Sequence, residues 1–218
     1  MEEEIAILMA DLTGYTALTE THGSVSAADM IDRYIALVAT CLVGDASLHE
    51  TTGDEVMIVS SSPDSLLATA LMLISKTSRE ENFLQIHGGL HYGTILKRRN
   101  KYFGSTINLT SRIAARADPG SFWCSDDFVN SLGNKSLANL HPKGKHGFKN
   151  INEEKEMFMI VPEHKQSFYI DPVCKMLLLD PSKATKHPES ENLFFCSIDC
   201  LNTYTKKEPG KTGAYHNS

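Results

Sequence analysis

The stretch that most constrains the fold is Ile5–Thr16, IAILMADLTGYT, in which an apolar run of strand length ends at Asp11. A buried strand followed by an acid and a glycine turn holds a carboxylate on a rigid support, and the N–H groups of such a turn can bind anions. A second strand-like segment starts at Gly53-Asp54. Either acid alone is more often an ordinary surface residue, but the pair, each beside a glycine turn, favours a shared divalent cation.

The composition is that of a globular protein and excludes several kinds of partner. The chain has 218 residues, of which 41% are hydrophobic, so it can form one large domain or a medium domain with a small one. Its net charge of -6 argues against a general nucleic-acid-binding surface. The acidic start MEEEIAIL is unlike a signal peptide, and no apolar run approaches the roughly 20 residues of a membrane helix. We therefore expect a cytoplasmic protein with no nucleic acid and no membrane partner.

Hydrophobic periodicity predicts an α+β fold, with helices on one face of a mostly antiparallel sheet. The composition changes after residue 161, where aliphatic residues become sparse and cysteines cluster. This change predicts a domain over 1–161, a linker over 162–167 and a small module over 168–218. The predicted helices cover 26–43, 63–76 and 106–116, and the predicted strands cover 5–11, 46–50, 55–60, 84–92, 94–97, 121–124, 137–140 and 156–161.

Four sequence blocks then match a known family in order and spacing: ILMADLTGYT, ETTGDEVMIVSSSP, YFGSTINLTSRIAARADPG and HGFKNINEEKEMFMIV. Residues 4–161 resemble the catalytic domain of class III nucleotide cyclases, the adenylate and guanylate cyclase family. The resemblance implies a ferredoxin-like palm sandwich. It also implies conversion of a nucleoside triphosphate into a 3′,5′-cyclic nucleotide and pyrophosphate in signal transduction.

The resemblance assigns roles to individual residues. Asp11 and Asp54 match the family's metal-binding acids, which would hold two divalent cations, Mg²⁺ or Mn²⁺. The turn after Asp11 would offer backbone N–H groups to phosphate. That turn consists of Leu12, Thr13, Gly14 and Tyr15.

The remaining catalytic positions lie further along the chain. Asn108 matches the residue that orients the ribose, and Arg112 the residue that stabilises charge on the α-phosphate. Lys149 matches the lysine that meets the terminal phosphates. In the family, the acids come from one subunit and these three residues from the other, so the resemblance implies a head-to-tail homodimer.

The base-reading positions depart from the adenine-selective pattern, a lysine and an aspartate, and here are Glu50 and Lys101. Glu50 could accept from guanine N1–H and N2–H while Lys101 donates to O6, which favours GTP over ATP. Guanylate cyclases also use glutamate at the first position but usually cysteine at the second. Alternatively, Glu50 and Lys101 pair with each other in a catalytically silent domain that senses nucleotide or metal.

The C-terminal segment resembles a YHS domain, a small metal-associated module with a treble-clef-like fold, in DPVCKM, LFFCSIDC and Pro209. Its Cys174, Cys196 and Cys200 are candidate thiolate ligands for zinc or copper. Lys175 replaces a glycine that the family often has. We expect that the module binds a metal and reports it to the cyclase domain.

The fourth ligand stays open among His187, His216 and water, and a redox-sensing thiol cluster is the rival interpretation. Cys41 and Cys124 stand alone in apolar surroundings and are predicted core residues.

Overall fold

A computed structural model describes residues 2–99, 101–151, 153–162, 169–174 and 176–207. The chain divides into two compact units, Met1–Lys165 and Gln166–Ser218. The predicted linker lies outside the described residues except for Pro162, so its bounds stay a prediction.

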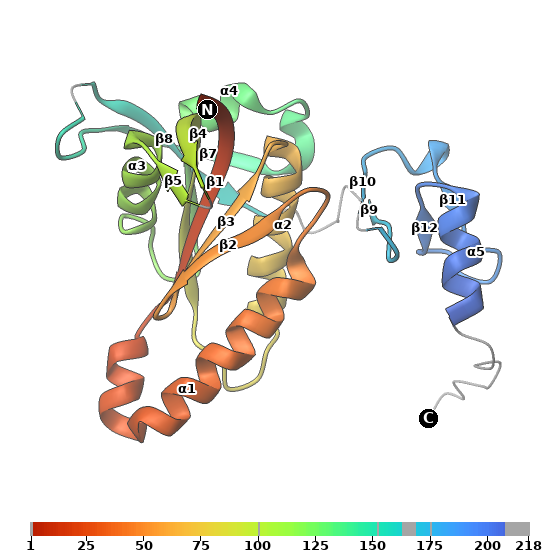
Figure 1. Ribbon diagram of the computed structural model, residues 1–218, viewed down its shortest axis with the longest axis horizontal. Coiled ribbons are helices and arrows are strands. Elements are labelled where there is room, and N and C mark those ends of the chain that lie inside the picture. The colour runs from red at the N-terminus through yellow and green to blue at the C-terminus, as the bar shows by residue number, and fades with distance from the viewer. Residues whose placement is uncertain (1, 100, 152, 163–168, 175, 208–218) are drawn as a thin grey trace. The chain divides into compact units, whose positions relative to one another are not determined.

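The first unit is built on one eight-stranded sheet, in which seven strands have the order β2-β3-β1-β4-β6-β8-β7 (Figure 1). The eighth strand, β5, forms a hairpin with the end of β4. β1 lies between β3 and β4 and is antiparallel to both. The order β4-β1-β3-β2, with a helix after β1 and another after β3, is the ferredoxin-like arrangement that the family resemblance implied. The strands are β1 (Glu2–Leu12), β2 (Ser47–Thr52), β3 (Glu55–Ser60), β4 (Ile86–Arg98), β5 (Lys101–Phe103), β6 (Phe122–Ser125), β7 (Asn139–His146) and β8 (Lys155–Val161).

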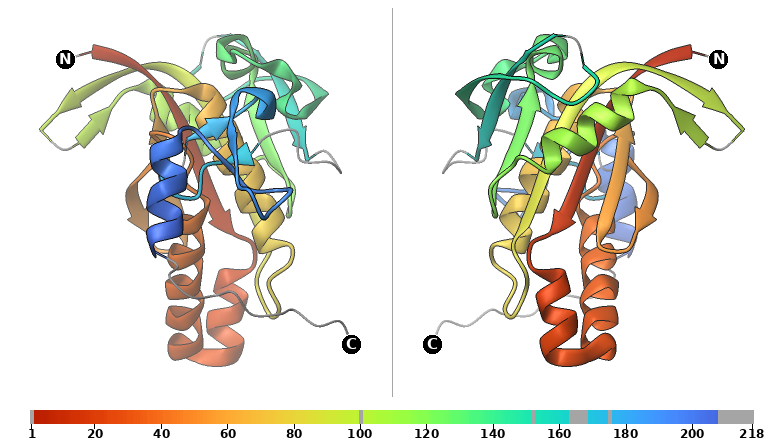
Figure 2. Two further views of the ribbon diagram at one scale, coloured as in Figure 1. Left: turned by 90° about the vertical axis from the view of Figure 1, so that its right-hand side faces the viewer. Right: turned by 90° about the vertical axis from the view of Figure 1, so that its left-hand side faces the viewer.

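Helices cover both faces of this sheet, so the prediction of helices on one face is wrong. α2 packs on β1, β3 and β4 from one side, whereas α3 packs on β4, β1 and β6 from the other (Figures 1 and 2). The physical reason is the continuous burial of Ile5–Ala10, which leaves both faces of β1 apolar and in need of cover. The helices are α1 (Tyr15–Cys41), α2 (Pro63–Thr77), α3 (Ser105–Ala114) and α4 (Asp126–Ser131).

The close seating of α3 depends on one glycine of β4. A Cβ atom at Gly89 would lie 2.4 Å from the Ala114 backbone nitrogen and 2.8 Å from the Thr110 carbonyl oxygen. Beside it, Met9 and Met57 form part of the apolar cluster under α3. Any larger side chain at Gly89 would push α3 away from the sheet.

Several boundaries differ from the sequence prediction. α1 begins at Tyr15 and contains a kink at Gly23, where φ is 82°, so its first turns escaped the periodicity. β4 runs unbroken through Gly93. The strand predicted over 137–140 instead begins at Asn139 and runs on to His146 as β7, with a register shift between Pro142 and Gly144. β5 and α4 were not predicted because each is shorter than the window that periodicity needs.

The described part of the second unit contains two short hairpins, a 3-10 turn at Pro181–Lys183 and one α-helix. β9 (Tyr169–Ile170) pairs with β10 (Leu177–Leu178), and β11 (Thr185–Lys186) pairs with β12 (Phe194–Phe195) before α5 (Ile198–Lys207) begins. Its small core contains fully buried Phe195 against the Tyr204 ring, with centroids 5.3 Å apart. Among the described residues of both units, no helix combines the length and apolarity that a bilayer span requires.

Cys41 and Cys124 are buried in the first unit, which confirms that they are core residues. Burial raises the pKa of both thiols. They are therefore poor nucleophiles and poor metal ligands at neutral pH.

A buried histidine beneath α4 makes stability depend on pH. His91 Nδ1 lies 2.7 Å from Ser125 Oγ, and that oxygen also accepts from the Phe128 N–H. Burial is the main influence that lowers the pKa of His91 from 6.5 to about 4, against the opposing charge of Asp127. The folded protein therefore keeps this imidazole neutral where the unfolded chain would protonate it.

We expect acid to destabilise the protein through His91. The unfolded chain binds a proton at this histidine as pH falls below 6.5, whereas the folded chain binds it only near pH 4. The contribution of His91 to the free energy of unfolding is therefore fully present above pH 6.5 and is lost between pH 6.5 and about 4. The expected loss between pH 7 and pH 5 is about 2 kcal/mol, measurable by urea unfolding. His91→Gln should lose clearly less, whereas His141→Gln, at an exposed position, should match the wild type. Equal losses in all three proteins would contradict this account.

Candidate active site and cysteine cluster

Two strand ends bring Asp11 and Asp54 together. Asp11 lies near the end of β1, and Asp54 follows Gly53 in the β2–β3 turn, where φ of the glycine is 62°. Ala10 pairs with Val56 across β1 and β3, so the two acids lie at the same end of these neighbouring strands. Burial, followed by a hydrogen bond and the charge of Asp54, raises the pKa of Asp11 to about 7. A double negative charge is therefore disfavoured at this pair, and a bound proton or cation would relieve it.

Three more polar side chains lie near Asp11 and Asp54, and the sequence analysis missed them. His87 lies directly opposite Asp11 in the β1–β4 register, and its Nδ1 is 3.0 Å from Thr13 Oγ1. The buried Tyr34 hydroxyl has no hydrogen-bond partner in the described part of the chain, and both acids help to raise its pKa, after burial. Burial and then Asp54 raise the pKa of Glu55. The strand register reveals His87, whereas Tyr34 reaches the two acids from α1 and Glu55 directly follows Asp54 in the chain.

The turn after Asp11 leaves fewer backbone N–H groups available to phosphate than predicted. The Leu12 N–H donates to Asp11 Oδ1 at 3.0 Å, and the Thr13 N–H donates to the Gln85 carbonyl at 2.7 Å. Gly14, with φ of 87°, caps the helix that Tyr15 begins. Because the first N–H groups of a helix have no intrahelical acceptor, the start of α1 is the part of this turn that faces outward to an anion.

Asn108, Arg112 and Lys149 lie around α3. Asn108 and Arg112 are one helical turn apart, and the Arg112 guanidinium donates to the Lys149 carbonyl. The loop with Lys149 is anchored by Phe148, which packs with Leu109 under α3. Among the described residues, none of the three polar side chains contacts Asp11 or Asp54 through a hydrogen bond or an ion pair.

Glu50 and Asn108 line the same cavity, which has a volume of about 260 Å³. Its walls combine apolar side chains from the cluster under α3 with carboxylates and small polar groups. Such a lining suits a ligand with polar groups better than a wholly apolar one. The cavity is lined by Met9, Glu50, Thr52, Glu55, Met57, Ile107, Asn108 and Ser111.

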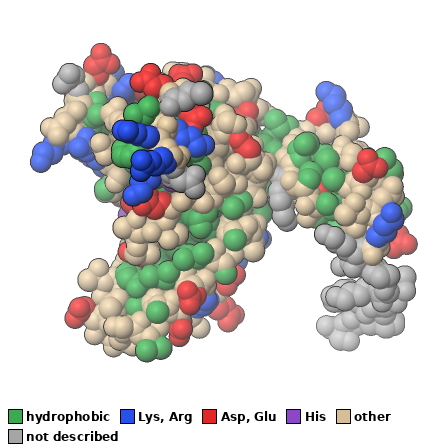
Figure 3. Space-filling model, viewed as in Figure 1, with side chains coloured by type: hydrophobic (Ala, Val, Ile, Leu, Met, Phe, Trp, Pro, Cys, Tyr) green, Lys and Arg blue, Asp and Glu red, His purple; other side chains and the backbone are tan. Residues whose placement is uncertain are grey.

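Lys101 is not among the residues that line this cavity. It is exposed on β5, at the tip of a projecting hairpin where Lys and Arg side chains gather (Figures 2 and 3). Its neighbour Tyr102 stacks on His49, with ring centroids 4.3 Å apart. Glu50 and Lys101 are both described, and no ion pair joins them. The alternative in which these two side chains pair with each other therefore gains no support.

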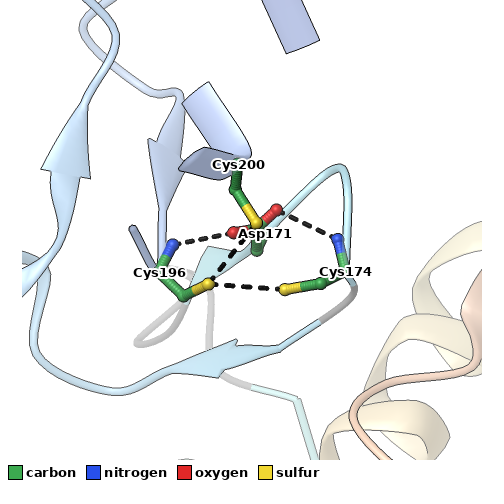
Figure 4. A group of neighbouring side chains, drawn as sticks. All are labelled: Asp171, Cys174, Cys196 and Cys200. Atoms are coloured by element: carbon green, nitrogen blue, oxygen red, sulfur yellow. Dashed lines mark hydrogen bonds between the residues drawn. The ribbon is translucent and has the colours of Figure 1, made fainter. Parts of the chain in front are cut away.

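The three cysteines of the second unit converge, as the sequence predicted (Figure 4). Cys196 Sγ lies 3.5 Å from Cys174 Sγ and 3.6 Å from Cys200 Sγ. A carboxylate that the sequence analysis missed, Asp171, joins them, and one donor atom from each of the four lies within 4.8 Å of the others. The Asp171 carboxylate is the first cause that raises the pKa of Cys196 to about 12, followed by burial. The neutral form of the Cys196 thiol is therefore favoured until a cation binds.

Of the two histidines named from the sequence as candidate fourth ligands, His187 does not belong to this group. His187 lies against Phe195 and Tyr204, with ring centroids 6.3 Å and 6.1 Å away, and its Nδ1 accepts from the Glu189 N–H. His216 lies outside the described residues.

Comparison with known proteins points to one family. The sequence profile of the adenylate and guanylate cyclase catalytic domain matches residues 1–162. An uncharacterized protein of Mycobacterium tuberculosis is 38% identical over 112 residues, which are 51% of this chain and 30% of that protein. An adenylate cyclase of Glutamicibacter nicotianae is 32% identical over 130 residues, 59% of this chain and 32% of the relative. The chain thus spans about a third of the length of these relatives.

The fold is similar to solved cyclase domains. The guanylate cyclase domain of RhGC from Catenaria anguillulae, solved in complex with GTP, superimposes with a TM-score of 0.62 and 17% identity. The match covers 74% of this chain and 98% of that domain. At this identity, the likeness concerns the fold alone.

Proposed function

Because the chain belongs to the adenylate and guanylate cyclase catalytic domain family, we propose that it converts a nucleoside triphosphate into a 3′,5′-cyclic nucleotide and pyrophosphate. The observation that carries this proposal is the contact between Asp11 and Asp54 at two strand ends. Two carboxylates held this close repel each other unless a proton or a cation lies with them. The pair is thus suited to divalent metal, and oxygen donors are those that Mg²⁺ and Mn²⁺ prefer.

Asp11 and Asp54 would hold two Mg²⁺ or Mn²⁺ ions. When bound, the ions supply charge neutralisation of the triphosphate and a lower pKa for the ribose 3′-hydroxyl. The Leu12 N–H bond to Asp11 fixes the orientation of that carboxylate. The start of α1 at Gly14 and Tyr15 would bind phosphate oxygens, because helix N-termini favour anions.

Residues on and beside α3 complete the reaction. Asn108 orients the ribose, so that the 3′-oxygen lies in line with the α-phosphorus. Arg112 donates to the α-phosphate oxygens as their negative charge grows, and Lys149 binds the terminal phosphates that leave as pyrophosphate. The hydrogen bond from Arg112 to the Lys149 carbonyl links α3 to the loop that contains Lys149. The two positively charged side chains are therefore held close together for the triphosphate.

The two residue sets belong to one active site only if two chains meet. We infer a head-to-tail homodimer in which one protomer supplies Asp11 and Asp54 and its partner supplies Asn108, Arg112 and Lys149. The absence of contacts between these two sets among the described residues supports this arrangement. Such a dimer contains two equivalent sites, and a monomer would be inactive.

The base is proposed to be guanine. Glu50 lines the cavity beside Asn108, so its carboxylate can accept from guanine N1–H and N2–H while the ribose lies at Asn108. Adenine would place an acceptor, N1, against the same carboxylate. Lys101 of the same subunit would have to reach O6 from the hairpin tip, either directly or after a movement of β5. The relative from Glutamicibacter nicotianae is named an adenylate cyclase, which makes ATP the direct competitor.

Product formation tests the activity and the base preference together. Purified protein is incubated with ATP or GTP, each with Mn²⁺ and with Mg²⁺, and cyclic nucleotides are quantified. We expect cyclic GMP in excess, and we expect Glu50→Lys to lower GTP turnover by at least tenfold and narrow the difference from ATP. Excess cyclic AMP would retain the enzyme but refute guanine selection by Glu50. No product from a dimeric protein would favour the silent, nucleotide-sensing alternative.

We also propose that residues 169–207 form a YHS-type module that binds zinc or copper through Cys174, Cys196 and Cys200. The convergence of the three sulfur atoms supports this, because it leaves them close to the separations of thiolates around one ion. A unit with so small a core would gain folding stability from the metal. Metal loading should change dimerisation or turnover if the module regulates the first unit, and unchanged values of both would refute that coupling.

A further inference from the structure

The spacing around the cysteine cluster defines four ligand positions rather than three. Cys196 and Cys200 are separated by three residues, and Asp171 and Cys174 by two. Pairs with two to four intervening residues are the usual spacing of tetrahedral zinc sites. The aspartate therefore occupies the place of the first ligand in the first pair.

The geometry brings all four positions to one point (Figure 4). The sulfur atom of Cys196 lies 3.5 and 3.6 Å from the other two sulfur atoms. Thiolates at about 2.3 Å from a tetrahedral zinc ion lie about 3.8 Å apart, so binding requires only small outward movements. Because every donor lies within 4.8 Å of the others, the carboxylate oxygen can reach the same ion.

Asp171 is a fully buried carboxylate. Oδ1 accepts from the N–H groups of Val173 at 2.7 Å and Cys174 at 3.2 Å, and Oδ2 accepts from the N–H of Cys196 at 2.7 Å. These bonds hold the two cysteine-bearing segments at fixed positions. Among the described cations, none pairs with Asp171. The three backbone N–H groups offset part of the cost of burying this charge, and a metal ion would supply the counter-charge that no described side chain provides.

The hydrogen bonds leave one coordination direction available. A carboxylate oxygen has two lone pairs, and Oδ1 uses both, whereas Oδ2 accepts one bond. Oδ2 can therefore bind a cation without losing a backbone donor. The same backbone donors would keep the oxygen oriented toward the sulfur atoms in the absence of metal.

We propose that Asp171 is the fourth ligand of a mononuclear site with three sulfur donors and one oxygen donor. This inference rests on the proposal that the three cysteines bind a metal. The oxygen donor selects Zn²⁺ over Cu⁺, because carboxylate is a poor partner for the soft monovalent ion. The bond from the metal to the carboxylate is also weaker than the bonds to the thiolates, which suits an exchangeable ion better than a permanent one.

Cobalt substitution in the reduced 218-residue protein distinguishes a ligand from a residue that only positions the cysteines. Wild-type protein with Co²⁺ should show tetrahedral d–d bands and sulfur-to-metal charge transfer from three thiolates. In Asp171→Cys, the charge-transfer intensity per metal should rise by about one third, because a fourth thiolate enters. Asp171→Asn should weaken zinc binding at least tenfold. The control Asp180→Asn, which alters a similar turn at Ser182 outside the cluster, should change neither property.

X-ray absorption of the zinc-loaded wild-type protein gives a test without a variant. We expect three sulfur atoms at about 2.3 Å and one oxygen at about 2.0 Å, without imidazole scattering. Imidazole scattering, four sulfur atoms, or an unchanged charge-transfer intensity in metal-loaded Asp171→Cys would overturn the role of Asp171 alone. If wild-type protein binds neither Co²⁺ nor Zn²⁺ through thiolate, the metal site itself is refuted, whatever the variants do.

Discussion

The Asp54→Asn variant is expected to lose turnover by about 10³-fold or more, because metal-assisted charge stabilisation contributes several kcal/mol to phosphoryl chemistry. Asparagine keeps the size of the side chain but removes the negative charge that would hold the cation. The fold should remain intact, since Asp54 lies in a turn and the substitution also relieves its repulsion with Asp11. The pKa of Asp11 should then fall from about 7 toward its ordinary value, because Asp54 is a principal cause of the shift after burial.

Turnover with GTP and Mn²⁺ measures the expected loss of activity, and far-UV circular dichroism with dimer mass measures the retained fold. Asp29→Asn, at an exposed position on α1, is the matched control and should keep wild-type activity. If Asp54→Asn altered only nucleotide or metal affinity while turnover persisted, Asp54 would have a binding role rather than a catalytic one.

The predictable part of this molecule follows from local pattern. The apolar run before Asp11 and the turn at Gly53-Asp54 predicted two strand ends, and the β1–β3 register brings these ends together. The spacing of Asn108 and Arg112 predicted a common helical face, and both lie on α3. These inferences succeeded because strand alternation and helix periodicity are properties of neighbouring residues.

The remainder depends on long-range pairing. His87 meets Asp11 only through the β1–β4 register, and Asp171 meets Cys196 across 25 residues. No periodicity encodes such contacts, although the two-residue spacing between Asp171 and Cys174 was a signal that could have been used. The exposed position of Lys101 likewise follows from the short β5 hairpin, which is too brief to predict from pattern.

The second large effect concerns Arg112. Arg112→Ala should lower turnover by about 10³-fold, since a fixed cation that stabilises transition-state charge is worth about 3 to 4 kcal/mol. The half-buried Arg112 donates to the Lys149 carbonyl, so its loss also loosens the loop that carries Lys149. Arg79→Ala, an exposed position after α2, is the control and should leave activity unchanged.

Joining the two inactive variants in one dimer tests the central claim that each active site is shared between protomers. Asp54→Asn and Arg112→Ala chains carry different affinity tags, are co-expressed, and are purified as the mixed dimer. One of its two sites then combines both substitutions, and the other contains neither. The account predicts about half of the wild-type turnover from this mixed dimer, although each variant alone is inactive. A verified mixed dimer that remains as inactive as its parents would contradict the shared site.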